Sequence, residues 1–261
     1  MKRSFGIPYR CLGAALACWL CLPAHAALVI DNGGFEAGLS GWSTVNLFDF
    51  PGGGSGSFFS QTGTGSPLLG ISVPPPPQGA FAAMTDAEGP GSHLLFQDFV
   101  VPASVGTTLL SFDVFVGNQA GVFHTPDHLD FSVTNPVGAL TLNQQARVDI
   151  VRPTIDPFTL SVTDIVFNAF QTNVGDPAIS GYTHFEVDIT AALTANLGAT
   201  LRLRFAEVDN VDVFHFGVDN VAFLTPGATP PGQAPEPGTL ALLIASFAVG
   251  AVGGTRRRSR R

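Results

Sequence analysis

Apolar and polar residues alternate with a period of two through much of the middle of the chain. In HFEVDI, residues 184–189, every second residue is apolar and the residues between are acidic or histidine, and in LRLRF, residues 201–205, apolar residues alternate with arginines. Because successive side chains of a β-strand point to opposite faces of the sheet, this alternation predicts strands with one buried and one solvated face.

Similar apolar segments, separated by Gly, Pro, Asn and Asp, predict further strands. Only ITAALTANLG, residues 189–198, has a helical pattern, and we expect a short helical turn that joins two strands. Many short strands without alternating helices predict an all-β fold, an antiparallel β-sandwich of the jelly-roll type that spans residues 27–224. The further strands are expected at Leu94–Val101, Leu109–Val116, Leu129–Val133, Arg147–Val151, Ser161–Phe167 and Phe214–Leu224.

One long segment interrupts this pattern. Residues 51–79 are rich in Gly, Ser and Pro, and this composition predicts a mobile surface loop. Within it, Leu68–Val73 could add an edge strand.

The N-terminus has the three parts of a secretory signal peptide. A basic leader, MKRSFGIPYR, precedes the apolar stretch CLGAALACWLCL, and Ala24-His25-Ala26 provides the small residues of a cleavage site. We expect residues 1–26 to be removed after Ala26, because a buried N-terminal helix, the alternative, rarely opens with a charged leader and closes on such a site. All three cysteines lie before residue 22, so the remainder has no disulfide, thiolate nucleophile or cysteine metal ligand.

The C-terminus combines a tether, an apolar segment and a basic cluster. Residues 225–234 form a Pro-rich linker, and residues 238–254 are uncharged and, as a helix, would span roughly 25 Å, enough to cross a thin membrane. Arginines resist translocation, so the terminal cluster predicts that this end stays cytoplasmic while the preceding chain is exported. The cluster consists of Arg256, Arg257, Arg258, Arg260 and Arg261.

Pro235-Glu236-Pro237, followed by the apolar segment and the arginines, resembles the PEP-CTERM sorting signal of Gram-negative bacteria over residues 235–261. The resemblance implies recognition by the membrane protease exosortase, transient anchoring in the inner membrane, and delivery to the cell surface or the exopolysaccharide matrix. Two alternatives fit less well. A buried core helix would need chain after it to pack over it, and a glycosylphosphatidylinositol signal would end on its apolar tail.

A second resemblance concerns the two ends of the predicted sandwich. Residues 32–36, Asn-Gly-Gly-Phe-Glu, followed by Gly41-Trp42, and residues 218–221, Val-Asp-Asn-Val, are similar to the first and last parts of galactose-binding-like jelly-roll modules. The resemblance implies a structural calcium ion that ties these parts together, with Glu36 and Asp219 as ligands and Asp31 as a candidate third. The alternative is that these carboxylates cap turns or accept backbone hydrogen bonds.

Charge is distributed unevenly along the chain. Residues 27–234 hold four basic residues (Arg147, Arg152, Arg202 and Arg204) and 19 of the 20 acidic ones, a net charge of −15. A phosphate backbone would repel such a surface, which excludes nucleic acid as a partner. An acidic polysaccharide could be joined through bridging calcium ions.

Other candidate sites have weaker patterns. After signal removal one Trp (Trp42) and one Tyr (Tyr182) remain for a sugar-stacking platform, and Trp42 is expected to be buried. Pro126 prevents a helix that would place His124 and His128 on one face, so a solvated loop is favoured over a metal pair. The run EVDNVD, with Asp209, Asn210 and Asp212, is expected to be a solvated acidic loop rather than a second oxygen cluster. Arg202 and Arg204 could bind an anion or pair with Glu186 and Asp188 across the sheet.

No spacing singles out a catalytic set, and Gly53-Gly54-Ser55-Gly56-Ser57 lacks the last glycine of a nucleophile elbow. We therefore expect an exported, non-enzymatic surface or matrix protein that is sorted by an exosortase and associates with extracellular polysaccharide in a calcium-dependent way. The alternatives are a secreted glycan-active enzyme with a carboxylate pair, a carbohydrate-binding module, and a structural adhesin that assembles through edge strands.

Overall fold

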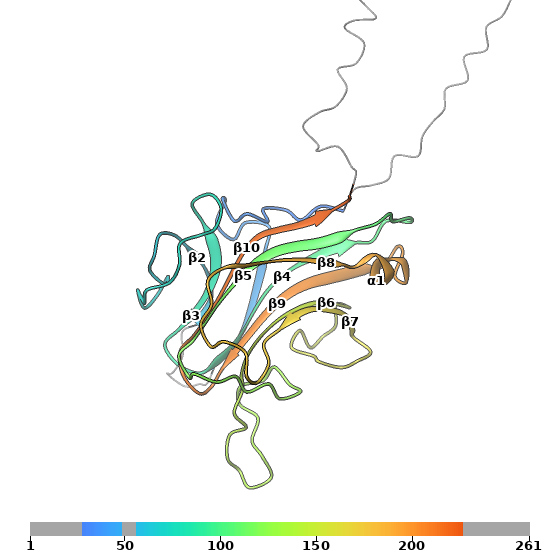
Figure 1. Ribbon diagram of the computed structural model, residues 1–261. Coiled ribbons are helices and arrows are strands. Elements are labelled where there is room, and N and C mark those ends of the chain that lie inside the picture. Colours follow the sequence, from blue (N-terminus) through green and yellow to red (C-terminus); the bar gives the residue numbers. More distant parts are fainter. Residues whose placement is uncertain (1–27, 49–55, 227–261) are drawn as a thin grey trace, which may run out of the picture.

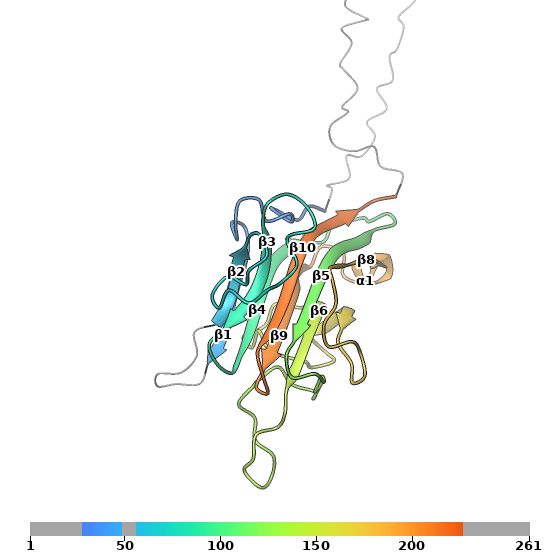
Figure 2. The same ribbon diagram turned by 60° about the vertical axis from the view of Figure 1, so that its left-hand side comes forward.

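The computed structural model describes residues 28–48 and 56–226, and these residues form an all-β sandwich (Figure 1). Two five-stranded antiparallel sheets pack face to face, with strand orders β1-β4-β9-β6-β7 and β2-β3-β10-β5-β8. Figure 2 shows the second sheet from its outer side. The chain crosses repeatedly between the sheets, as in a jelly roll, so the predicted all-β antiparallel sandwich is confirmed. The strands are β1 Ser43–Phe48, β2 Gly56–Gln61, β3 Ala82–Ala87, β4 Gly91–Val100, β5 Leu109–Asn118, β6 Gln144–Val151, β7 Ile165–Gln171, β8 Thr183–Asp188, β9 Thr200–Asp209 and β10 Phe214–Leu224.

The strands with clear alternation form where they were predicted. Five of the six residues of HFEVDI lie in β8, and LRLRF lies inside β9. The predicted helical turn is also present, as the short helix α1, Thr190–Thr194, which joins these two strands. The prediction for residues 161–167 is right only in part, because β7 begins at Ile165.

Leu129–Val133 was predicted as a strand, and this prediction is wrong. Leu129 and Phe131 are buried, but they belong to a loop that covers the outer face of the first sheet together with Phe158. The backbone N–H of Phe131 donates to Ser92 Oγ, and the Asn210 side chain donates to the Phe131 carbonyl. The alternation in this segment therefore reflects a loop that packs on a sheet, not a strand within one.

Residues 51–79 are not loop throughout. Gly56–Gln61 is β2, an edge strand that pairs with β3. The expected edge strand at Leu68–Val73 is absent from this described segment, where Gly65 and Ser72 form an isolated bridge instead. Residues 62–81, the 62–81 segment, connect β2 to β3 and lie against the outer face of the second sheet, where Val73 packs on Met84 and Phe115.

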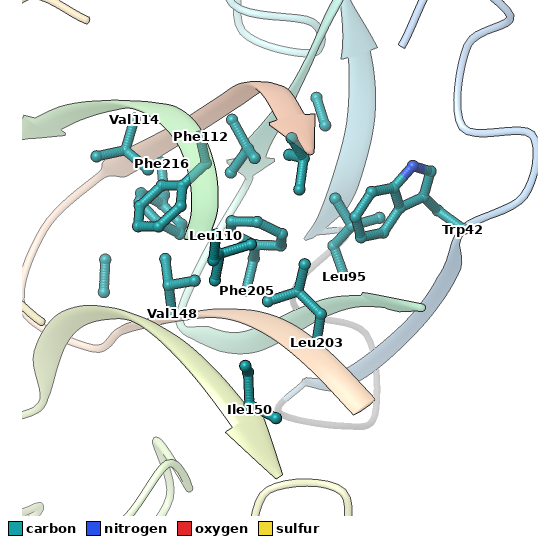
Figure 3. Close-up of a cluster of buried hydrophobic side chains, with 14 of the residues drawn as sticks. Trp42, Leu95, Leu110, Phe112, Val114, Val148, Ile150, Leu203, Phe205 and Phe216 are labelled. Atoms are coloured by element: carbon teal, nitrogen blue, oxygen red, sulfur yellow. The ribbon is translucent and has the colours of Figure 1, made fainter. Parts of the chain in front are cut away.

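The core lies between the two sheets and is rich in phenylalanine. Phe112 from one sheet meets Phe205 from the other in an edge-on contact with ring centroids 6.1 Å apart. Figure 3 shows this cluster, with Trp42 packed at its margin beside Leu95. The strong burial of these rings supplies the main stabilisation of the sandwich.

Candidate functional site

The segment before β1 folds into a tight loop that docks on the last strand. Asn32 organises the loop, since its side chain donates to the carbonyls of Gly38 and Ser40, and its own carbonyl accepts from Trp42 Nε1. The Val221 N–H donates to the Gly33 carbonyl at 2.9 Å. Two stretches almost 190 residues apart in the chain thus meet, as the second resemblance implied.

Glu36 and Asp219 face the same stretch of backbone from this junction. Glu36 Oε1 accepts the N–H groups of Ala80 and Phe81 at 2.9 and 3.1 Å. Asp219 Oδ2 accepts the N–H of Gln78 at 3.3 Å. Both carboxylates therefore hold the end of the 62–81 segment by accepting backbone hydrogen bonds. This is the role expected of them if they bind no calcium ion.

The electrostatics of Asp219 favour a cation beside it. The pKa of Asp219 is raised to about 7, chiefly by burial and also by the charges of Asp113 and Glu36, and the hydrogen bonds from the Asn220 and Gln78 N–H groups oppose part of the shift. A bound cation would offset this cost of keeping a buried carboxylate ionised. The donor set fits calcium in chemical type, but calcium takes 6–8 oxygens, so carbonyls and water would have to complete the site.

Asp31 lies apart from the other two predicted ligands. Its backbone N–H and carbonyl bond to the Gln97 side chain, and its carboxylate lies against Gly41. Within residues 28–48 and 56–226, one group of three His, Cys, Asp or Glu side chains has donor atoms that all lie within 4.8 Å of one another. This group is elsewhere, at His93, Glu207 and Asp209.

The two aromatic residues considered for sugar stacking are occupied by the fold. Trp42 is 9% exposed and packs on Phe35 and Phe205, as expected for a buried tryptophan. Tyr182 packs against Phe115, and its hydroxyl is buried beneath β10. A platform built on either residue is therefore inconsistent with their packing.

A cleft of about 240 Å³ opens between the two sheets at their β7 and β8 edges. Val114, Val116 and Phe123 form its apolar floor, and the rings of Phe170 and Phe185 flank it. The remaining lining residues are Thr172, Asp176, Pro177, Ser180 and Thr183, and all of these except Pro177 have hydroxyl or carboxylate side chains.

The walls of this edge cleft are held in place by packing and by backbone hydrogen bonds. Phe185 stacks on Phe112 with an interplanar angle of 14°, and its centroid is 5.2 Å from that of Phe170. The loop between β7 and β8 docks on β5, where the Ser180 N–H donates to the Val116 carbonyl at 2.9 Å. The cleft is thus preformed, which lowers the entropic cost of binding a ligand.

The sequence analysis missed the edge cleft because its residues come from β5, β7, β8 and two loops. No local pattern joins them, and a phenylalanine at the open edge of a sandwich has the same alternation as one in the centre. The phenylalanine content was instead interpreted as core, which is right for Phe112 and Phe205 but incomplete for Phe170 and Phe185.

Arg202 and Arg204 do not pair with Glu186 and Asp188, one of the two alternatives that the sequence left open. Arg202 pairs with Asp98 at 2.6 Å, and the buried Arg204 pairs with Asp149 at 2.8 Å. Both partners lie on the same sheet as the arginines, whereas β8 belongs to the other sheet. Neither guanidinium is therefore free to bind an anionic ligand.

Two loop predictions also need correction. Asp209 and Asn210 are not part of a solvated loop, because Asp209 is buried and the Asn210 side chain donates to the carbonyls of Phe131 and Thr141; Asp212 is exposed, as expected. His124 and His128 do lie in a loop, but both are half-buried rather than solvated.

The predicted signal peptide and sorting signal lie outside the described residues, and so do residues 227–234 of the predicted linker, Ala24, Ala26, Pro235–Pro237 and the terminal arginines. In the part that the structure describes, no helix has the length and apolar character needed to span a membrane.

No family model matches this chain, and no curated protein matches it. Among solved structures, it is similar to a carbohydrate-binding module of the β-sandwich superfamily, with 14% identity and a TM-score of 0.42, over 74% of this chain and 61% of that one. It is also similar to the K3 cleaved adhesin domain of Lys-gingipain from Porphyromonas gingivalis W83, with 13% identity and a TM-score of 0.42, over 77% and 100% of the two chains. A third is TmCBM61 in complex with β-1,4-galactotriose, with 12% identity and a TM-score of 0.36, over 76% and 99%. The chain thus spans less than two thirds of the first of these structures, and at these identities and TM-scores none of them indicates what it binds.

Proposed function

We propose that this chain is an exported, non-enzymatic protein of the cell surface or extracellular matrix that binds glycan in its edge cleft. The observation that carries the proposal is the combination of flanking phenyl rings and a hydroxyl- and carboxylate-bearing rim in one preformed cleft. Pyranose rings have apolar faces that pack on aromatic rings and hydroxyl edges that need hydrogen-bond partners.

The size of the cleft limits the ligand. Its volume of about 240 Å³ is just below the roughly 300–1,000 Å³ of sites for drug-sized molecules. It suits one or two sugar rings, so we expect recognition of a chain end or a branch rather than a long stretch of backbone.

Blocking the mouth of the cleft tests this function. Thr183 is an exposed residue at the rim, and Thr183→Trp would fill the opening, whereas Thr107→Trp places the same ring on an exposed loop outside the cleft-lining set. In affinity electrophoresis through gels that contain galactan, xylan, β-glucan or alginate, we expect at least one polysaccharide to retard the wild type and Thr107→Trp but not Thr183→Trp. Equal retardation of all three proteins, or none in any gel, would contradict the proposal.

The sorting of the protein is part of the same proposal and rests on the sequence of its ends. The basic leader and the terminal arginines both favour export of the acidic middle across the inner membrane of a Gram-negative bacterium. The PEP-CTERM resemblance supports exosortase as the partner that removes the tail, after which the sandwich stays on the surface or in the exopolysaccharide matrix.

Calcium is a second element of the proposal, supported by the buried, destabilised carboxylate of Asp219 beside Glu36. A calcium ion there would link the first loop, the 78–81 backbone and β10. We expect calcium to raise the thermal midpoint of the wild type and a chelator to reverse the shift, while Asp219→Asn removes the response. A thermal midpoint that does not change with calcium would contradict the proposed calcium site. It would not affect the proposal that the edge cleft binds glycan.

A further inference from the structure

The inner face of the first sheet changes character at one end of the sandwich. Along β9, Leu201, Leu203 and Phe205 point into the main core, and the next two inward positions are Glu207 and Asp209. On the neighbouring β4, His93 lies directly opposite Glu207, and Gly91 lies opposite Asp209. All three side chains are buried, so the row of core residues ends in an imidazole and two carboxyl groups.

The hydrogen bonds of His93 orient it as a ligand. The Asn46 side chain donates from Nδ2 to Ser57 Oγ, which directs its Oδ1 toward His93 Nδ1, 3.0 Å away. A carbonyl oxygen can only accept, so Nδ1 carries the proton and Nε2 presents its lone pair. Metal-binding histidines are typically fixed in this manner by a carbonyl on the ring nitrogen that does not bind the metal.

Two buried atoms of this cluster have no hydrogen-bond partner among the described residues. They are His93 Nε2 and Glu207 Oε1, although His93 is 0% and Glu207 1% exposed. Unpaired buried polar atoms are costly, so such a pair within one cluster indicates a missing partner. Asp209 is oriented as well, because its Oδ1 accepts the Gly91 N–H at 2.9 Å.

Glycines leave the room that the imidazole needs. A Cβ atom on Gly56 or Gly91 would fall 2.5 or 2.6 Å from His93 Nε2. The edge of the ring that carries Nε2 therefore lies beside Gly91, the residue that donates to Asp209. One donor atom from each of the three residues lies within 4.8 Å of the other two, close enough for small side-chain rotations to bring them onto one ion.

We propose that His93, Glu207 and Asp209 bind one divalent transition-metal ion, with zinc as the best match, inside this end of the sandwich. One imidazole nitrogen and two carboxylate oxygens are a ligand set that zinc accepts, whereas calcium takes only oxygen. Two carboxylates and a divalent cation are together neutral, which removes the cost of burying like charges. A cavity of about 130 Å³ borders Asp209 and offers a route for the ion and space for a completing water; its lining also includes Ala87, Gly89, Pro90, Asn210, Val211, Asp212 and Val213.

The pKa shifts of His93, Glu207 and Asp209 all reflect their burial in this cluster. Burial lowers the pKa of His93 to about 4 and raises the pKa of Asp209 to about 7, and burial followed by the charge of Asp209 raises the pKa of Glu207 well above its usual range. The competing interpretation is a metal-free cluster in which a proton on Glu207 or Asp209 keeps the pair neutral. The test distinguishes the two.

The test is a zinc titration of the full-length chain in detergent, followed by calorimetry and by thermal unfolding. Cys11, Cys18 and Cys21 are alkylated beforehand, because free thiolates would bind zinc themselves. We expect the wild type to bind one zinc ion per chain with a raised thermal midpoint. Glu207→Gln is nearly isosteric and removes a buried charge, so it should fold, yet lose at least tenfold in zinc affinity. Asn46→Ala, which frees the His93 ring, should weaken zinc binding about 10–100-fold.

Glu36→Gln is the matched control, because it removes a carboxylate from the proposed calcium site and should leave zinc binding unchanged. Cobalt(II) adds a spectroscopic readout, since its visible absorption bands should appear on binding to the wild type and be absent in His93→Gln. Absence of zinc binding by the wild type, or equal binding by the wild type and Glu207→Gln, would overturn the proposal in favour of the proton-sharing cluster. Neither result bears on the proposals for glycan binding in the edge cleft or for the calcium site, because those sites involve other residues.

Discussion

Arg204 has the largest fully buried side chain among the described residues, and its surroundings explain how the fold accommodates it. Its guanidinium donates to Asp149 Oδ2 at 2.8 Å and to the carbonyls of Pro157 and Thr159. The loop that carries these carbonyls thereby closes over the outer face of the first sheet. A basic residue in an alternating strand can thus be a buried structural group rather than part of a wet face.

This arrangement predicts a large difference between two ion pairs on the same sheet. Asp149→Asn leaves the buried Arg204 without its counter-charge and should destabilise the protein by about 3–5 kcal/mol. Asp98→Asn breaks the more exposed pair with Arg202 and should cost about 0–1 kcal/mol. Urea unfolding of both variants measures the difference, and equal costs would contradict the structural role given to Arg204.

Gly33 gives a second prediction at the residue scale, because no side chain fits where the first loop docks on β10. A Cβ atom there would lie 1.9 Å from the Val221 carbonyl oxygen, whereas a Cβ on Gly34 would meet nothing within 4 Å. We expect Gly33→Ala to cost about 1–3 kcal/mol and Gly34→Ala to change stability by less than about 0.5 kcal/mol. Thermal unfolding of the two variants checks this, and similar midpoints would mean that the loop is not docked as described.

At the scale of elements, the sequence predicted strands well where apolar and polar residues alternate. β8 and β9 have this alternation, and both were found, but β9 is buried on both faces over most of its length, so the wet face predicted for it is wrong. All six residues of β3 are buried, so no alternation marks it, and β2 is composed largely of Ser, Phe and Gly within a low-complexity stretch. These strands are defined by their partners across the sheet, which a local pattern cannot reveal.

The same limit applies to the candidate sites. Glu36 and Asp219 could be selected because short motifs surround them, and the structure brings both to the 78–81 backbone. His93, Glu207 and Asp209 become neighbours only through the pairing of β4 with β9, and the polarity of Asp209 suggested a solvated loop instead. The three side chains meet because of the register in which β4 pairs with β9, and the composition of the segments does not show this register.

The 62–81 segment is held on the second sheet by Asp86 of β3, and this contact should be sensitive to acid. Burial alone would raise the pKa of Asp86, but the hydrogen bonds from His215, the Leu69 N–H, Ser66 and the Leu68 N–H outweigh it and lower the pKa to about 2. An aspartate whose folded pKa lies below its unfolded value near 3.9 contributes stability above that value and loses it as the pH falls toward 2.

Asp86→Asn should therefore destabilise the protein by about 2 kcal/mol at pH 7, and the difference from the wild type should shrink between about pH 4 and pH 2. Urea midpoints at a series of pH values measure this. A difference that stays constant over that range would show that the charge of Asp86 is not what holds the segment.

At the scale of the whole molecule, the proposed export depends on the ends of the chain and the proposed binding depends on the sandwich. Removing residues 235–261 should abolish anchoring and processing, because the apolar segment and the arginines are lost together. Fractionation of cells that express the intact and the truncated chain, with the mass of each product, checks this. Identical distribution and identical mature mass would argue against exosortase processing.

The most direct measurement is the retention of the protein in the matrix of a Gram-negative host that has an exosortase and makes exopolysaccharide. Wild type, Thr183→Trp and Thr107→Trp are expressed as full-length chains, and the protein in the cells, the matrix and the medium is quantified. We predict that all three are exported and trimmed alike, that the wild type and Thr107→Trp remain in the matrix, and that Thr183→Trp is released into the medium. Retention of Thr183→Trp equal to that of the wild type, or recovery of the untrimmed wild type from the cytosol, would contradict the account.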